Sequence, residues 1–130
     1  MKEVIEMTKG QIEAKISEGV SKFEVEFMGR GPQKIKTILV GDLVIIRLMG
    51  FLSQAERQIV ENNEGVELLK KMRTMLFEKN LSHFHNVIND ILPFKILSTH
   101  SDVSTITGEK MIIITFDSNI EETIIKLGDE

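Results

Sequence analysis

A run of hydroxyl, imidazole and carboxylate side chains extends from Ser98 to Glu109, between two apolar segments that are typical of β-strands. Within it, His100 and Asp102 are two residues apart, so an extended chain points both side chains to the same face. An imidazole oriented by a carboxylate is a familiar acid–base arrangement, and the pair could also form half of a metal site. The alternative is the polar outer face of a hairpin with no chemical role.

The other parts of a catalytic or metal site are missing from the sequence. No GxSxG nucleophile elbow, GxxxxGKS/T phosphate-binding loop or HExxH zinc motif occurs, and the chain has no cysteine. His83 and His85 fall two apart in a predicted helix, where they face different directions and cannot bind one metal together. We therefore expect a protein that is not an enzyme and that has no metal or other cofactor.

A second group of charged residues lies in a predicted β-hairpin made of residues 33–40 and 43–49. The two-residue connection Gly41-Asp42 sets the register of this hairpin, and that register puts Lys36 directly opposite Arg47. Like charges in this position repel each other. An anion, the carboxylates of a partner or solvent alone would relieve the repulsion, and the sequence leaves these alternatives open.

The same face of this hairpin carries an apolar patch nearer the turn. Contiguous apolar surface of this size usually marks an interface, so we expect a homodimer, or another element docked over the patch. The opposite face of the hairpin should belong to the core. The patch consists of Ile38, Val40, Leu43 and Ile45, and the core face consists of Ile35, Thr37, Leu39, Val44, Ile46 and Leu48.

Glycines flank an arginine in the segment Gly29-Arg30-Gly31-Pro32. Free backbone N–H groups and the guanidinium of Arg30 could hold an anion there. However, the segment follows a predicted helix, and the C-terminal end of a helix carries the negative end of its dipole. The sequence therefore favours a helix stop, in which glycine takes the left-handed conformation and proline prevents continuation.

The composition is that of one globular domain covering residues 1–130, with 42% hydrophobic and 28% charged residues. A net charge of −4 and the lack of Tyr and Trp argue against a nucleic-acid partner. The N-terminal residues 1–6 include acids and do not resemble a signal peptide, and no apolar run approaches the roughly 20 residues that span a bilayer. We expect a cytoplasmic protein that reaches a membrane only through a partner.

Apolar periodicity predicts a helix over residues 3–28 before the first hairpin. Ser53-Gln-Ala-Glu56 matches a capping box, which should start a short helix that continues to residue 62. A break at Glu64-Gly65 should precede a longer helix, with a bend at Lys79-Asn80, that ends at Pro93. The stripe of this longer helix that should face the core consists of Leu68, Leu69, Met72, Met75, Leu76, Phe84, Val87, Ile88 and Ile91.

A second hairpin with a longer polar loop is predicted from residues 94–102 and 110–117, followed by one helical turn after Ser118. The order of elements is therefore α-ββ-α-α-ββ. This order is typical of an α+β fold, in which two antiparallel hairpins form a sheet with long helices packed on one face.

Several of these segments, in their order and spacing, resemble the MpsC-like family, a bacterial domain of unknown function. The chain is similar to its short, single-domain members over nearly the whole length, from about residue 12 to 119. The segments are Gly29-Arg-Gly-Pro, Gly41-Asp42, Arg47, Gly50 with Ser53-x-Ala-Glu56, Glu64-Gly65 and His100-Ser-Asp-Val-Ser-Thr-x-Thr-Gly-Glu109.

The resemblance implies a soluble cytoplasmic accessory component of a sodium-translocating, membrane-potential-generating system. The membrane subunits of such systems are also linked to uptake of dissolved inorganic carbon. Expected partners are a second copy and a membrane transporter subunit. The resemblance implies no catalytic residues, and the recurrent polar positions of the family correspond here to Arg30, Arg47, His100, Asp102, Thr105 and Glu109.

The alternative function is a small-anion sensor. Lys36, Arg47 and Arg30 would hold the anion, and His100 and Asp102 would tune the site. This arrangement requires that the two hairpins pair edge to edge and share one face.

Overall fold

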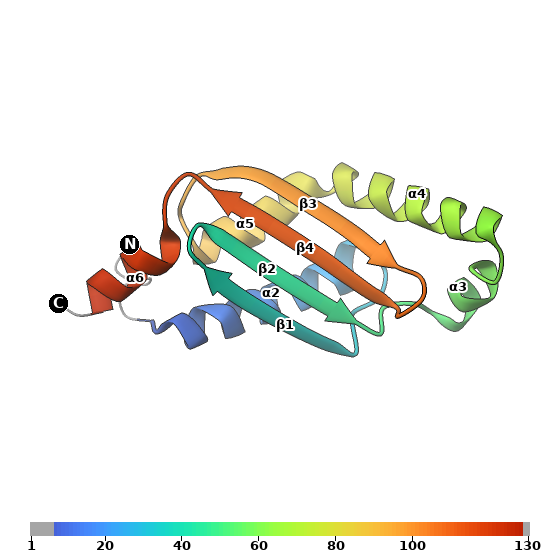
Figure 1. The fold of residues 1–130 in the computed structure, drawn as a ribbon, viewed down its shortest axis with the longest axis horizontal. Coiled ribbons are helices and arrows are strands. Elements are labelled where there is room, and N and C mark those ends of the chain that lie inside the picture. Colours follow the sequence, from blue (N-terminus) through green and yellow to red (C-terminus); the bar gives the residue numbers. More distant parts are fainter. Residues whose placement is uncertain (1–6, 129–130) are drawn as a thin grey trace.

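The computed structural model describes residues 7–128, and among them the side chains up to residue 124. The strands form a single antiparallel sheet of four, in the order β1-β2-β4-β3. The predicted α+β fold and its order of helices and strands are therefore confirmed (Figure 1). The elements are α2 (Lys9–Phe27), β1 (Lys34–Val40), β2 (Leu43–Met49), α3 (Gln54–Ile59), α4 (Asn63–Lys79), α5 (Leu81–Ile91), β3 (Ile96–Ser104), β4 (Glu109–Phe116) and α6 (Ile120–Gly128).

The first hairpin, β1 and β2, has the register that its two-residue turn predicts. Gly41 has a φ angle of 61°, the left-handed conformation that such a turn needs and that glycine adopts without strain. The predicted core face of the hairpin is buried, except that Ile35 at its open end is half-buried. The confirmed pairs are Val40 with Leu43, Ile38 with Ile45, and Lys36 with Arg47.

The two hairpins join edge to edge, because β2 pairs with β4 in an antiparallel ladder. In the second hairpin, β3 begins and ends two residues later than predicted, at Ile96 and Ser104. The residues from Ser98 to Ser104 pair with β4, so most of the polar run is strand and only residues 105–108 form the turn.

Helix α2 lies against the inner face of the sheet, but it begins later than predicted. Thr8 and Gln11 form a capping box, in which Oγ1 of Thr8 accepts a hydrogen bond from the backbone N–H of Gln11 at 3.1 Å. Such a box places the first turn directly after Thr8. Residues 3–6 of the predicted helix lie outside the described residues, as does the expected absence of a signal peptide. Gly29, with a φ angle of 92°, follows the end of the helix, so the predicted helix stop is confirmed.

Helix α3 starts as predicted, with Ser53 and Glu56 forming the capping box, but ends at Ile59. Helix α4 already begins at Asn63, because the side chain of Asn62 accepts a hydrogen bond from the N–H of Gly65 at 2.8 Å. Gly65 therefore lies within the first turn of α4. The predicted break at Glu64-Gly65 is wrong. A Cβ atom at this position would clash with the carbonyl oxygen of Ile59.

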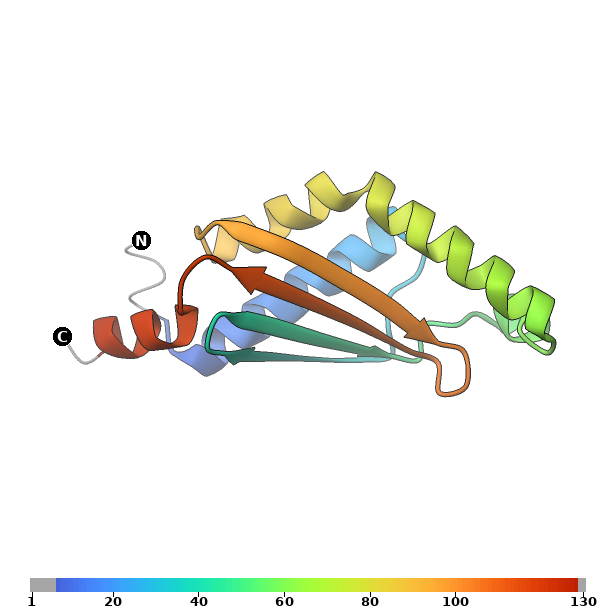
Figure 2. The ribbon, with the colours of Figure 1, turned by 45° about the horizontal axis from the view of Figure 1, so that its top comes forward.

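The predicted bend is confirmed, since α4 ends at Lys79 and α5 begins at Leu81. The predicted core stripe holds in α5 but is wrong in much of α4, where Leu68 and Met75 are more than 60% exposed and Arg73 and Phe77 are buried. The reason is that α3 and the N-terminal half of α4 project beyond the end of the sheet (Figure 2). This half of α4 packs only on a small second cluster, in which Leu69 lies with Phe51, Leu52 and Val103 at the end of the sheet.

The core lies between the inner face of the sheet and the helices α2, α5 and α6 (Figures 1 and 2). Helix α6 is longer than the single predicted turn, because Ile120 and Ile124, four residues apart, are both buried in this core. Within residues 7–128, no helix has both the length and the apolar character needed to cross a membrane.

Candidate interaction surfaces and a buried charge cluster

The outer face of the sheet, which looks toward the viewer in Figure 1, carries most of the predicted site residues. Cross-strand pairing arranges its side chains in rows that run from β1 through β2 and β4 to β3. The rows are Val40, Leu43, Thr115 and Ser98; Ile38, Ile45, Ile113 and His100; Lys36, Arg47, Met111 and Asp102; and Lys34, Met49, Glu109 and Ser104.

Arg47 and Glu109, both predicted site residues, meet on this face. Nε of Arg47 donates to Oε2 of Glu109 at 2.6 Å, and the two side chains are 52% and 24% exposed. Lys36 lies directly opposite Arg47 and has no ion-pair partner within the described part of the chain. Asp102 lies at the far end of the same row, where its Oδ1 accepts a hydrogen bond from the N–H of Val103 at 2.8 Å. The sheet thus brings the basic and acidic candidates onto one face, with the cations on one side and the acids on the other.

The apolar residues predicted as an interface lie in the neighbouring rows. Ile38 and Val40 are 40% and 43% exposed, and Leu43 and Ile45 are half-buried. On β4, Met111 and Ile113 extend this surface and were not predicted, although the strict alternation of β4 would have placed them there. The outer apolar patch therefore consists of Ile38, Val40, Leu43, Ile45, Met111 and Ile113.

Arg30 and Thr105 lie outside these rows. Arg30 is in the connection between α2 and β1, and its Nη1 donates to the carbonyl of Leu52 at 3.1 Å. Thr105 is in the turn between β3 and β4. Within the described residues, no group of three or more His, Cys, Asp or Glu side chains could hold a metal ion.

The two helical histidines have separate contacts. His83 stacks on Phe27, with ring centroids 4.5 Å apart. Nε2 of His85 lies 2.8 Å from Oγ1 of Thr99, and burial lowers the pKa of His85 below its ordinary value. They face different partners, as their spacing on the helix requires.

A buried ion pair lies on the inner face of the sheet. Nζ of Lys110 donates to Oε1 of Glu24 at 2.9 Å, and both side chains are only 2% exposed. The ammonium also lies 4.6 Å from the ring centre of Phe77, which attracts cations through its negative face. Burial lowers the pKa of Lys110 below its ordinary value, although Glu24 acts in the opposite direction.

A second ion pair anchors α4 to α3. Nη2 and Nε of Arg73 donate to Oε2 of Glu56 at 2.7 and 3.2 Å, and the guanidinium carbon lies 4.7 Å from the ring centre of Phe51. Burial tends to raise the pKa of Glu56, but hydrogen bonds from Ser53 and Arg73 and the charge of Arg73 lower it below its ordinary value. This pair explains why Arg73 is buried on α4 in place of the predicted apolar residues.

Sequence reasoning placed Glu56 in a capping box but missed both ion pairs, because charged side chains are almost never fully buried unless they are paired. A signal for Lys110 did exist, since it alternates in phase with the inward-facing Ile112 and Ile114. No comparable signal identified its partner Glu24, which is separated from it by 86 residues.

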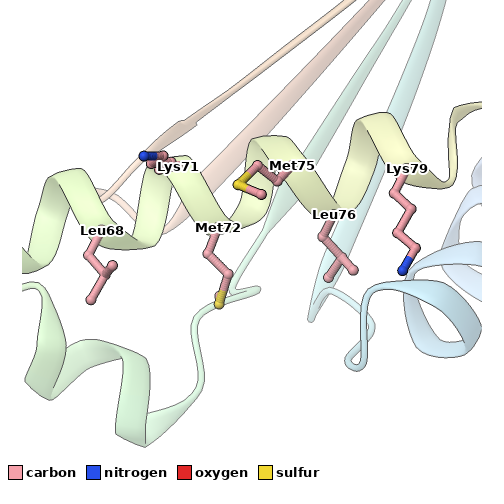
Figure 3. A pocket seen from close by; sticks show the side chains of 6 residues that line it. All are labelled: Leu68, Lys71, Met72, Met75, Leu76 and Lys79. Carbon is pink, nitrogen blue, oxygen red and sulfur yellow. The ribbon is translucent and has the colours of Figure 1, made fainter.

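An apolar groove of about 710 Å³ runs along α4, beside the buried side of this helix. Figure 3 shows Leu68, Met72 and Leu76 pointing to the same side of the helix. Met75 also lines the groove, and Lys71 and Lys79 add a positive charge each. Because Leu68, Met72 and Met75 are exposed, this surface could receive an apolar element of a partner.

Residues 8–118 match the model of a protein family described as "Na+-translocating membrane potential-generating system (MpsC)". Two Bacillus subtilis (strain 168) proteins are similar to the chain. The uncharacterized protein YbcI is 31% identical over 92% of this chain and 97% of its own length. The uncharacterized protein YrhF is 27% identical over 79% of this chain and 85% of its own length.

No solved structure matches the chain. The family match covers most of the sequence, from the N-cap of α2 to the residues after β4. It therefore includes the whole sheet, the buried ion pairs and the groove on α4. The chain belongs to the MpsC family.

Proposed function

We propose that this chain is a non-enzymatic, cytoplasmic accessory protein that binds a subunit of a membrane ion-translocating system. The description of the family supports this proposal, since it names a system that translocates Na+. The system would carry sodium ions or dissolved inorganic carbon, as the resemblance implies. The groove on α4 is the observation on which the proposed binding role rests.

The groove has the chemistry of a site for a helix. Its exposed apolar residues Leu68, Met72 and Met75 follow the spacing i, i+4, i+7, so they form one continuous stripe. An amphipathic helix binds such a surface through its own apolar stripe. Methionine side chains are flexible and polarisable, which lets them adapt to the shape of a partner.

The charges in the groove indicate the kind of partner. Two of the six lining residues, Lys71 and Lys79, are cations, and none of the six is an acid. A partner helix with carboxylates beside its apolar stripe would complement these charges. The proposed contact is thus an acidic amphipathic segment, on the cytoplasmic side of a membrane protein.

Affinity purification from detergent-solubilised native membranes tests this proposal. The tagged chain is expected to retain an integral membrane protein of an ion-translocating complex. A Leu68→Ser/Met75→Ser variant should lose this protein, because two polar side chains interrupt the apolar stripe while the core residues of α4 are untouched. Circular dichroism checks that the variant is folded.

Val25→Ser is the matched control, since Val25 is 60% exposed on α2 and does not line the groove. It should retain the membrane protein as the unmodified chain does. The proposal fails if native membranes yield no integral membrane protein, or if the α4 variant retains as much of it as the control.

A small-anion sensor ranks second and is favoured by the two cations that face each other at Lys36 and Arg47. It ranks lower because Glu109 already supplies a carboxylate to Arg47 at 2.6 Å. Calorimetric titration with bicarbonate, phosphate and nucleotides tests it. Heat of binding that Arg47→Ala abolishes would support the sensor, and no heat with any of these anions would exclude it.

A further inference from the structure

The outer face of the sheet carries the outer apolar patch, and none of the helices within residues 7–128 covers this face (Figure 1). We propose that a second copy of this chain covers this face, so that the two sheets pack face to face in a symmetric dimer. Sheets packed in this way lie about 10 Å apart with strands nearly aligned. The inference does not depend on the proposed function, because the groove on α4 shares no residue with this face.

The order of strands determines which residues would meet. We place the two-fold axis between the sheets, parallel to the strands and midway between β2 and β4. Rotation about this axis brings β1 of one copy over β3 of the other, and β2 over β4, because a two-fold interface uses the same surface on both copies. Each row then faces the same row of the second copy. In the row that runs from Ile38 to His100, Ile45 packs on Ile113 of the other copy.

The charges on the two edges of the face support this orientation. Lys34 and Lys36 lie on β1, and Asp102 lies on β3. The proposed axis therefore places Lys36 near Asp102 of the second copy, and it does so twice. Lysine has a long, flexible stem, which accommodates the rotation of one sheet on the other.

An axis across the strands gives poorer complementarity. If such an axis passed through the centre of the sheet, β1 would lie over β1 of the second copy in the opposite direction. Lys36 would then face Ile38, and Lys34 would face Val40. Cations buried against aliphatic side chains are costly without a partner charge, so the axis parallel to the strands is favoured.

The size of the face predicts how tight the dimer is. Strands β1 and β2 have seven residues each. With about 3.3 Å per residue and about 4.8 Å between strands, the face measures roughly 23 Å by 19 Å. Two such faces with their side chains bury an area close to the ~1,000 Å² at the lower limit of specific interfaces. We therefore expect a reversible dimer whose population depends on concentration.

A charge-exchange experiment tests the dimer and its orientation together. Sedimentation equilibrium would measure the dissociation constant of the unmodified chain, Lys36→Asp, Asp102→Lys and the double variant. Each single variant creates two like-charge contacts in the dimer and should raise the dissociation constant about tenfold or more. The double variant exchanges both charges and should restore it to within about threefold.

Restoration can arise only between two copies. Within one chain, Lys36 and Asp102 lie on opposite edge strands, about 14 Å apart at the spacing of a β-sheet. Salt screens charges at this distance, so direct coupling within one chain is weak. Ile45→Asp is the third variant and should abolish the dimer, because it places a charge at the centre of the interface.

Three other outcomes would contradict the interface, the orientation of the axis or the dimer itself. A dimer that Ile45→Asp leaves intact would show that the copies meet elsewhere. A double variant as weak as the single ones would exclude the axis parallel to the strands. A chain that stays monomeric at all accessible concentrations would overturn the proposal, and the purification experiment on α4 would be unaffected by any of these results.

Discussion

At Lys110 and Met111, strand β4 reverses the usual polarity of a strand with one covered face. Lys110 points into the core and is 1% exposed, whereas the next residue, Met111, points to the outer face. Antiparallel sheets with one uncovered face normally alternate apolar residues inside with polar residues outside. Here the inner lysine has an acid and an aromatic ring as partners, and the outer methionine belongs to a patch that no described helix covers.

This difference shows that burial decides how strongly the loss of one charged partner affects stability. Glu24 and Lys110 are sealed between α2 and β4, where solvent cannot replace a lost partner. Arg47 and Glu109 form an even shorter pair on the outer face, but water reaches both. A one-residue shift of β4 would also move Lys110 to the outer face and away from Glu24. We therefore expect the inner pair to specify register and the outer pair to be replaceable.

The largest expected effect comes from breaking the inner pair. Glu24→Ala leaves the ammonium of Lys110 buried without its carboxylate and should lower the free energy of unfolding by about 3–5 kcal/mol. Urea denaturation measures this change. Glu18→Ala is the control, because its carboxylate is 71% exposed on the same helix, and it should change stability by less than about 0.5 kcal/mol.

The double variant Glu24→Leu/Lys110→Met separates the attraction between the two charges from the cost of burying them. Replacing both charges with apolar side chains of similar size removes the desolvation cost along with the attraction, so this variant should be about as stable as the unmodified chain. A Glu24→Ala variant that loses less than about 1 kcal/mol would show that the inner pair is not effectively buried.

Two neighbouring isoleucines on β4 allow the inner and outer faces to be compared through the loss of an apolar side chain. Ile114 is 0% exposed in the core, and Ile113 is half-buried on the outer face. Ile114→Ala should cost about 2–5 kcal/mol, since it leaves a cavity among packed side chains. Ile113→Ala should cost about 1 kcal/mol or less in dilute solution. Thermal unfolding of both variants measures the difference, and equal losses would mean that something already covers the outer face.

Acid should lower the stability of the fold through Glu56 and His85. The folded-state pKa values of Glu56 and His85 both lie below their ordinary values of 4.5 and 6.5. The unfolded chain therefore binds more protons below these values, and stability is lost as the pH falls first through the His85 window and then through that of Glu56. Urea midpoints measured against pH should show both losses. His85→Gln should remove the upper loss and Glu56→Gln the lower one, and a stability independent of pH from neutral to acid would contradict this assignment.

The smallest effect is expected from the outer pair. Arg47→Ala removes a hydrogen bond of 2.6 Å, but its side chain is 52% exposed, so water and salt screen the charge. Exposed pairs of this kind contribute about 0–1 kcal/mol. Chemical denaturation of Arg47→Ala should therefore give nearly the stability of the unmodified chain. If Arg47→Ala lost as much stability as Glu24→Ala, solvent exposure would not explain the difference between the two ion pairs.

Local rules were sufficient for the hairpins and for several helix ends. The Gly41-Asp42 turn predicted the complete register of β1 and β2, because a two-residue loop permits only one alignment of its strands. Ser53 and Glu56 predicted the start of α3 through a capping box. Each signal is contained within a few consecutive residues, so the sequence alone is enough to predict the element.

The sequence alone determined that this chain folds as α+β, where its first hairpin turns, and which of its residues are able to carry charge or apolar contact. Only the tertiary structure decided which of them meet. The pairing of β2 with β4 put Arg47 beside Glu109, and the packing of α2 on the inner face of the sheet paired Glu24 with Lys110. The physical reason is that these partners are 62 and 86 residues apart, so their contact depends on the whole fold and not on any local pattern.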